Sequence, residues 1–213
     1  MIGLYIVIAV VVLLIVAFIA SYNRFVRQRN LVQESWRQID VELRRRHDLI
    51  PNLVETVKGY AAQERTVLTA VTEARSAAVQ TMQGTAGGVA AQAQAESTLG
   101  RALGGLFAVA ESYPDLKSSQ NFLALQQQLA ETEDRIAAGR RFYNGNVRAL
   151  NTRVEAFPSS IIASMFNFTK AEYFEVDEPE VRAPVAVDFS SIAQPVQPGS
   201  ATTESPQAGQ PPA

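Results

Sequence analysis

The chain has 213 residues, with 19 Lys and Arg against 21 Asp and Glu, no cysteine and one histidine. This length suits one domain with accessory segments, and the nearly balanced charge excludes a strong field that would attract nucleic acid. The lack of cysteine excludes disulfides, thiolate metal sites, a thiol nucleophile and a lipidated cysteine. A His-rich metal site and a Ser-His-Asp triad are disfavoured, because both would have to rely on His47.

Residues 1–20, MIGLYIVIAVVVLLIVAFIA, form an uncharged apolar run. At ~1.5 Å per residue it is long enough to cross a hydrocarbon core of ~30 Å, so it predicts a transmembrane anchor over residues 1–21. A cleavable signal peptide is one alternative, but the run lacks a basic start, and a cut after Ala20 would place Phe18 where a small residue is needed. A buried core helix is the other alternative, and the length of the run disfavours it.

Three arginines follow the apolar run, Arg24, Arg27 and Arg29, and no acidic residue comes before Glu34. The positive-inside rule therefore predicts a single-pass protein of the cell membrane with its N-terminus outside and its main body in the cytoplasm. These arginines are also the side chains best placed to meet lipid headgroups.

From Tyr22 to about Gln80, apolar or small residues recur every three or four positions, which predicts one long stalk helix. Pro51 lies inside this helix. It lacks an N–H and crowds the carbonyl of His47, so we expect a kink near residues 46–50.

The remaining elements are separated by glycine and proline. The stretch QGTAGGV at 83–89 predicts a loop before a helix rich in small residues. A later helix ends before Pro158, which we expect to form a hard corner. The expected helices span about residues 90–111, 120–156 and 159–166, and an aromatic wrap follows them.

The predicted fold class is all-α, with an N-terminal transmembrane helix continuing into a long stalk helix and an antiparallel bundle of three to four helices. The expected parts are the anchor at 1–21, the bundle at 22–178 and a tail at 179–213. Most of the chain's ten prolines lie in that tail, which lacks apolar periodicity and is predicted to be disordered.

The basic stretch RRRHD at 44–48 is one candidate site. Arg45 lies roughly 35 Å beyond the anchor along a helix, which exceeds the Debye length of ~10 Å and disfavours contact with lipid. The alternative is a solvated face in which Glu42 pairs with Arg46. His47 is then either a pH-sensitive group or an ordinary packed or surface residue.

The stretch RRFYNGNVRALN is a second candidate, for an interaction or for setting helix register. Asn144 and Asn151 are seven positions apart and so share a face of the helix, next to Tyr143. They form either a polar patch for a ligand or partner, or a pair of interhelical hydrogen-bonding amides beside a packed tyrosine.

No metal or cofactor site is expected. A di-iron carboxylate bundle needs a Glu-x-x-His motif on each of two helices, and the chain has none. Glu133 and its acidic neighbours are expected on a solvated face or paired with Arg135 or Arg140.

Two long stretches of the chain resemble the LemA family. Residues 22–64 carry YN after the anchor and RRHDLIPNLV, and residues 113–175 carry YPDLK, RRFYN, FP and a closing YFE. The glycine-rich loop and the tail are outside this signature. The resemblance implies a membrane-anchored helical bundle with an outside N-terminus. It also implies no established enzyme activity, although some members act in magnetosome formation.

The function expected from these observations is a non-enzymatic membrane-anchored scaffold or adaptor acting through protein–protein contacts. Its expected partners are the lipid bilayer, other membrane-associated proteins and a second copy of the chain. The alternative is a regulatory accessory subunit of a membrane enzyme or protease complex. A hydrolase or metal enzyme is disfavoured, because no nucleophile, base and ligand set is evident.

Overall fold

A computed structural model describes residues 1–84 and 87–175, all within one compact unit. The described residues form helices and contain no strands, which confirms the all-α prediction. The predicted disordered tail at 179–213 lies outside them. The helices are α1 (Ile2–Tyr60), α2 (Arg65–Gln83), α3 (Gly88–Glu111), α4 (Pro114–Lys117), α5 (Gln120–Glu155) and α6 (Ser159–Met165).

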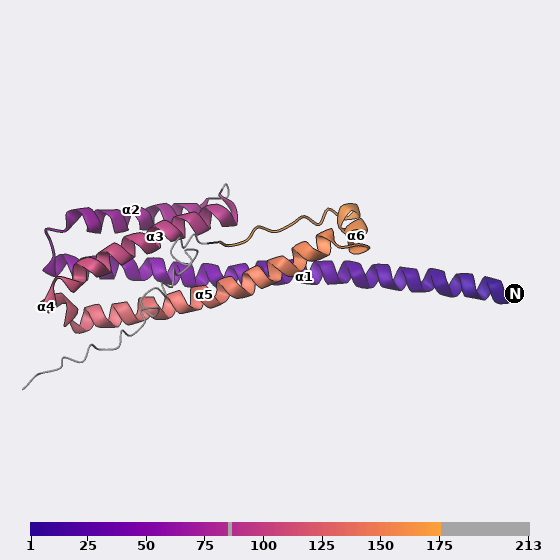
Figure 1. Cartoon of the computed structure of the whole chain (residues 1–213), viewed down its shortest axis with the longest axis horizontal. Coiled ribbons are helices and arrows are strands. Elements are labelled where there is room, and N and C mark those ends of the chain that lie inside the picture. Colours follow the sequence, from indigo (N-terminus) through magenta and orange to yellow (C-terminus); the bar gives the residue numbers. More distant parts are fainter. Residues whose placement is uncertain (85–86, 176–213) are drawn as a thin grey trace, which may run out of the picture. The chain divides into compact units, whose positions relative to one another are not determined.

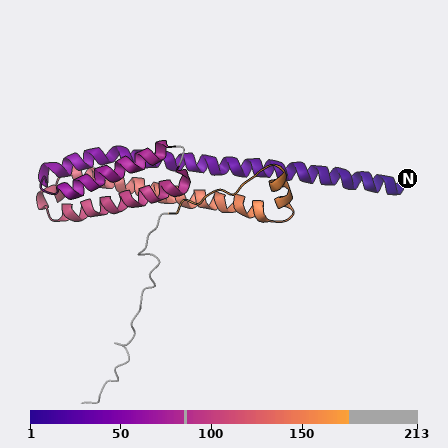
Figure 2. The same ribbon diagram turned by 90° about the horizontal axis from the view of Figure 1, so that it is seen from above.

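The long helices alternate in direction along the chain. α2 runs back along the second half of α1, α3 reverses again, and α5 returns antiparallel to α1 (Figures 1 and 2). The most extensive packing is between α1 and α5 and between α2 and α3. The result is an antiparallel four-helix bundle from which the first part of α1 continues.

The expectation of one helix from Tyr22 to about Gln80 was wrong, because α1 ends at Tyr60. The chain turns at residues 61–64, where the N–H of Ala61 bonds the carbonyl of Val57 at 2.8 Å. Gly59, in the last turn, weakens the helix by ~1 kcal/mol relative to alanine. The fold-back also lets Val57 and Val71, both fully buried, share one core, which a straight helix could not achieve.

The bounds of the later helices agree closely with those predicted from the sequence. α3, α5 and α6 begin and end within about two residues of their predicted bounds. Pro158 makes the expected corner between α5 and α6, and the Phe157–Pro158 peptide is cis. α1 runs through Pro51 as one continuous helix, and the kink angle there stays a prediction.

The bundle has two hydrophobic cores. The distal core joins α1, α2, α3, α4 and the start of α5. The proximal core joins α1, the rest of α5, α6 and the segment after it, with Ala93 of α3. The largest fully buried side chains of the distal core are Ile50, Leu53, Val57, Val71, Leu99, Leu106 and Leu116, and those of the proximal core are Phe25, Ile39, Leu43, Val147 and Phe174.

The N-terminal part of α1 packs against little of the bundle. Among the described helices α1 is long and apolar enough to cross a membrane, with a window of mean hydropathy 3.3 and none of that window buried. Leu13, for example, is 67% exposed. An apolar surface of this length without protein cover suggests membrane anchoring.

Candidate interaction site

A layer of polar and charged side chains separates the two cores. On α1, Leu43 belongs to the proximal core and Ile50 to the distal core, and Arg46 and His47 lie between them. Glu96 on α3 faces them, and Arg46, His47 and Glu96 are only 4%, 2% and 3% exposed. We call the set Arg46, His47, Gln92, Glu96 and Glu133 the buried charge layer.

Glu96 is the centre of this layer. One carboxylate oxygen accepts from the Arg46 guanidinium, and the other lies 3.0 Å from His47 Nε2 and accepts from Gln92 Nε2 at 2.6 Å. Arg46 donates its second terminal nitrogen to Glu133 of α5 at 2.7 Å. Arg46 therefore connects α1 to α3 and α5 at one level of the bundle.

Glu96 is held in its ionised form. Burial by itself raises the pKa of Glu96, but the hydrogen bonds and charges of His47 and Arg46 together outweigh it and leave the pKa below its ordinary value of 4.5. An ionised carboxylate only accepts hydrogen bonds, so His47 presents Nε2–H to it. The charge on Glu96 thus compensates the desolvated charge of Arg46.

The predicted pairing of Arg46 with Glu42 was wrong. Arg46 is buried and does not pair with Glu42, which instead lies 3.7 Å from Arg45 and 3.7 Å from Arg135. Glu133 has a side chain 60% exposed, which agrees with the solvated face expected for it, and it pairs with Arg46 of another helix. Arg44 does lie on a solvated face as expected, with a side chain 65% exposed and paired to Asp40.

The sequence did contain a signal for the burial of Arg46. The core positions of α1 advance in steps of three and four, and between Leu43 and Ile50 that rhythm requires one more inward position. Arg46 occupies it. A charged residue on an apolar stripe therefore marked a buried charge, although nothing local identified Glu96 as its partner.

Pro51 is connected to the same layer. Because proline has no N–H, the carbonyl of His47, four residues earlier, lacks its usual helical donor. Arg75 of α2 supplies the missing bond by donating Nε to the His47 carbonyl at 2.7 Å. A side chain from the neighbouring helix thereby compensates the proline within α1.

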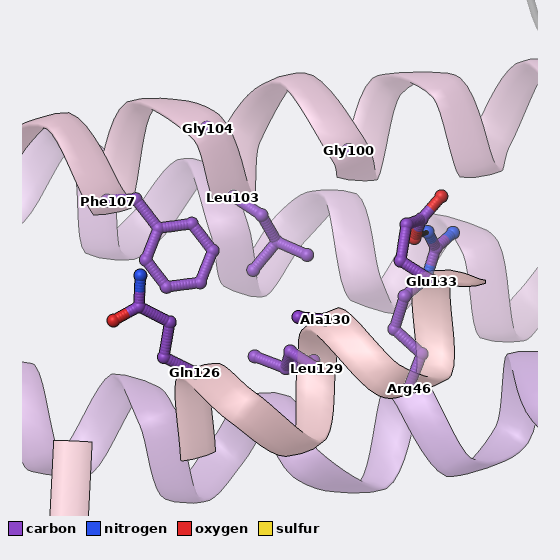
Figure 3. A pocket seen from close by; sticks show the side chains of 9 residues that line it. All are labelled: Arg46, Gly100, Leu103, Gly104, Phe107, Gln126, Leu129, Ala130 and Glu133. Carbon is purple, nitrogen blue, oxygen red and sulfur yellow. Dashed lines mark hydrogen bonds and ion pairs between the residues drawn. The ribbon is translucent and has the colours of Figure 1, made fainter. Parts of the chain in front are cut away.

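A groove of about 420 Å³ opens beside the charge layer, between α3 and α5. Figure 3 shows Leu103 and Phe107 facing Leu129 across it, with Arg46 and Glu133 at one end. A Cβ placed on Gly100 or Gly104 would meet nothing within 4 Å, so the α3 wall is open. The full lining is Arg46, Gly100, Leu103, Gly104, Phe107, Gln126, Leu129, Ala130 and Glu133.

One donor at the end of this groove is unused. Arg46 Nε is buried and has no hydrogen-bond partner among the residues that the structure describes, although both terminal nitrogens of the same guanidinium are paired. A buried N–H without an acceptor costs about 1–3 kcal/mol.

Asn144 and Asn151 do not link two helices, which corrects the expectation of interhelical amides. Asn151 donates to the carbonyl of Ala171 at 3.0 Å and accepts its N–H at 2.8 Å, and Asn144 pairs in the same two-bond manner with Phe174. Seven helical residues rise ~10.5 Å and three extended residues span about 10 Å, so the spacings match.

Tyr143 completes this attachment. Its hydroxyl donates to the carbonyl of Glu172 at 2.8 Å, and burial, with a smaller effect from the charge of Glu172, raises the pKa of Tyr143 to about 12. The hydroxyl therefore remains a donor at neutral pH. Tyr143 and the two asparagines thus hold the segment after α6 against α5, away from the charge layer.

The three arginines predicted to flank the membrane follow the apolar part of α1. Arg24, Arg27 and Arg29 are all exposed, and the guanidinium of Arg29 lies 5.5 Å from the centre of the Phe168 ring. They are not close to the buried charge layer.

Comparison with known proteins decides the family. The family model described as LemA matches residues 35–189, which is most of the chain. The chain belongs to the LemA family. The matched range includes the charge layer, the groove and the asparagine pair, and it begins after the apolar part of α1.

Named proteins from two organisms are similar to this LemA family member. Magnetosome protein MamQ 1 and magnetosome protein MamQ 2 of Paramagnetospirillum magneticum are each 30% identical to it over 199 residues, covering 82% of this chain and 73% of theirs. Protein LemA of Metamycoplasma hominis is 26% identical over 175 residues, covering 82% of this chain and 77% of its own.

Proposed function

We propose that this protein is a membrane-anchored scaffold that binds a helix of a membrane-associated partner in the groove between α3 and α5. The groove itself carries the proposal, because it combines an open glycine wall with apolar side chains. Amphipathic helices bind in grooves of this kind through apolar residues one turn apart.

The groove has the length and shape for about two turns of a helix. Its α3 residues run from Gly100 to Phe107 and its α5 residues from Gln126 to Glu133, so each wall spans roughly 10 Å. Glycine at positions four apart lets a second backbone approach closely.

The titratable groups here favour binding over chemistry. His47, the one histidine of the chain, is 2% exposed, and Glu96 already accepts from three side chains. A general base must reach a proton on its substrate, and neither group projects into open space. An accessory subunit of a membrane enzyme complex would use the same groove. The identity of the bound partner would distinguish this accessory role from that of a scaffold.

The apolar part of α1 supports the anchor, and the arginines after it support a cytoplasmic bundle. Because the chain has no cysteine, single substitutions allow labelling of intact cells with an impermeant thiol reagent. We expect Gly3→Cys to be labelled and Ala130→Cys to be labelled only after lysis. The reverse pattern would overturn the orientation.

The test of the groove is photo-crosslinking in intact membranes. A photoreactive amino acid in place of Ala130, which is exposed on the groove, should form one main adduct, and mass spectrometry should map it to a single helix of one protein. Gly104→Phe should abolish the adduct by filling the groove. The added side chain has room, because nothing lies within 4 Å of its Cβ position.

Gly145→Phe is the matched control. Gly145 also has nothing within 4 Å of its Cβ position, but it lies on α5 outside the groove. Crosslinking at Ala130 should survive this substitution. Equal loss in both variants, or no adduct at all, would refute the groove as a docking site, and an adduct between two copies of the chain would identify self-assembly instead.

A further inference from the structure

α6 presents an apolar face that the rest of the described chain leaves uncovered. Ile161 and Met165, four positions apart and so on one side of the helix, are 54% and 63% exposed, and the preceding Phe157 is 83% exposed. The other side of α6 buries Ile162 and Ala163 in the proximal core. Several large apolar side chains grouped at one place normally mark an interaction surface.

Aromatic contacts place this face next to the end of the apolar run. The ring of Phe166, directly after α6, lies 5.9 Å from that of Phe18 and 4.8 Å from that of Tyr22. Phe18 is in the last turn of the uncharged run, ~3 Å from its end at Ala20. Figures 1 and 2 show α6 beside α1 and lying across its direction.

Cationic side chains lie just past the same level. Arg153, near the end of α5, is 5.7 Å from the centre of the Phe25 ring. Burial, and then the nearby positive charge of Arg24, lower the pKa of Arg153, so these two cations lie close enough to repel each other. Lipid phosphates at this level would relieve that repulsion.

We propose that α6, with Phe157 and Phe166, is a second membrane contact that lies in the headgroup–acyl boundary of the bilayer spanned by residues 1–20. Apolar side chains on one side and arginines beside them are the pattern of a helix lying in the membrane interface. The occupant is the bilayer, because Phe166 makes the apolar face continuous with the exposed surface of α1 through Phe18. This inference rests on the membrane anchor of the proposed function.

A second contact has a consequence for the scaffold. A bundle attached through α1 alone could tilt relative to the membrane, because one helix supplies one point of attachment. With α6 also in the interface, the tilt of the bundle would be set. The groove between α3 and α5 would then be presented to partners in a defined direction.

Depth measurement with fluorescent probes tests the inference on the full chain. Single cysteines replace Leu13, Ile161, Met165 or Leu123, and each variant carries an environment-sensitive dye. The proteins are reconstituted in nanodiscs containing equal amounts of phosphatidylcholine and phosphatidylglycerol, with or without bromine on the acyl chains. Leu123, an apolar residue 48% exposed in the first turn of α5, is the matched control.

We expect the bromolipids to quench the dye strongly at Leu13 and measurably at Ile161 and Met165. At Leu123 the quenching should not exceed that of free dye in solution. Quenching at Leu13 with none at Ile161 and Met165 would overturn the inference and leave the anchor intact. A blue-shifted but unquenched dye on α6 would show protein cover and overturn it too. No quenching at Leu13 would overturn the membrane span itself, and the inference with it.

Discussion

Removal of Glu96 should destabilise the bundle far more than removal of an exposed ion-pair partner. In Glu96→Ala, Arg46 stays buried with a side chain only 5% exposed, and its remaining carboxylate, Glu133, has a side chain 60% exposed. Breaking a buried pair from one side costs about 3–5 kcal/mol. Since Glu133 still pairs with Arg46, we expect about 3 kcal/mol, or roughly 6–12 °C in Tm at 2–4 °C per kcal/mol for a chain of this size.

Trp36 is a suitable reporter for this measurement. It is the single tryptophan of the chain, and its ring lies 5.4 Å from Tyr143 and 5.3 Å from Phe174 in the proximal core. Urea unfolding of the full chain in detergent, followed by Trp36 fluorescence, gives the free energy of unfolding. Apolar replacement of both partners, Arg46→Met with Glu96→Leu, should cost less than the sum of the single changes.

The matched control is Arg44→Ala. Arg44 belongs to the same basic stretch and pairs with Asp40, but its side chain is 65% exposed. Exposed pairs contribute about 0–1 kcal/mol, so this variant should resemble the parent protein. If Glu96→Ala and Arg44→Ala lowered stability equally, the idea that the charge layer stabilises the bundle through buried pairing would be wrong.

The same carboxylate gives a pH dependence. Since the pKa of Glu96 in the folded protein lies below its ordinary value of 4.5, the stability it contributes is complete above pH 4.5. That contribution is lost as the pH falls through the lower folded-state pKa. Glu96→Gln should reduce the loss of stability in this acid range, as measured by urea unfolding at a series of pH values. An unchanged acid dependence would contradict the lowered pKa.

Three further predictions concern backbone support and helix packing. Arg75→Met should lower the free energy of unfolding of the parent protein by about 1.5–3 kcal/mol, the range for a charged hydrogen bond. In a Pro51→Ala background, which restores the helical N–H, the same substitution should lower it much less. Equal losses in the two backgrounds would refute the idea that Arg75 compensates the proline. Asn151→Ala should increase hydrogen exchange at the amide of residue 171 by NMR while the amides of α2 stay protected, and an unchanged rate would refute the attachment. Gly145→Ala should raise the free energy of unfolding by about 0.5–1 kcal/mol. Gly139→Ala should raise it by less, because the added Cβ would lie 3.0 Å from Ile39 Cγ1. An equal increase in the two variants would contradict that close contact.

The local elements follow from local sequence. An uncharged run predicts the apolar part of α1 from its composition, and glycine, proline and helix-forming residues predict where α3, α5 and α6 begin and end. Pro158 restricts its own backbone and that of its neighbour, so the corner after α5 needed no tertiary information. The family resemblance also depends on short motifs within single elements.

The turn at residues 61–64 was decided by tertiary packing. Alanine, glutamine and glutamate in this stretch are compatible with a helix, and Gly59 weakens it by only ~1 kcal/mol. The gain comes from burying both arms of the hairpin in one core, and that energy depends on residues far along the chain. A periodic pattern of apolar residues indicates that one face of a helix is apolar. It does not indicate which segment covers that face.

The candidate site shows the same division. Residue spacing predicted correctly that Asn144 and Asn151 share one face of α5. The same spacing puts Arg46 at an inward position of α1, although the prediction from sequence assigned Arg46 to a solvated face. The packing of distant segments brings Arg46 to Glu96, fifty residues away, and binds the two amides to the backbone at Ala171 and Phe174. The physical reason is that spacing along a helix sets the direction of a side chain, whereas the partner it meets depends on which distant segments pack together.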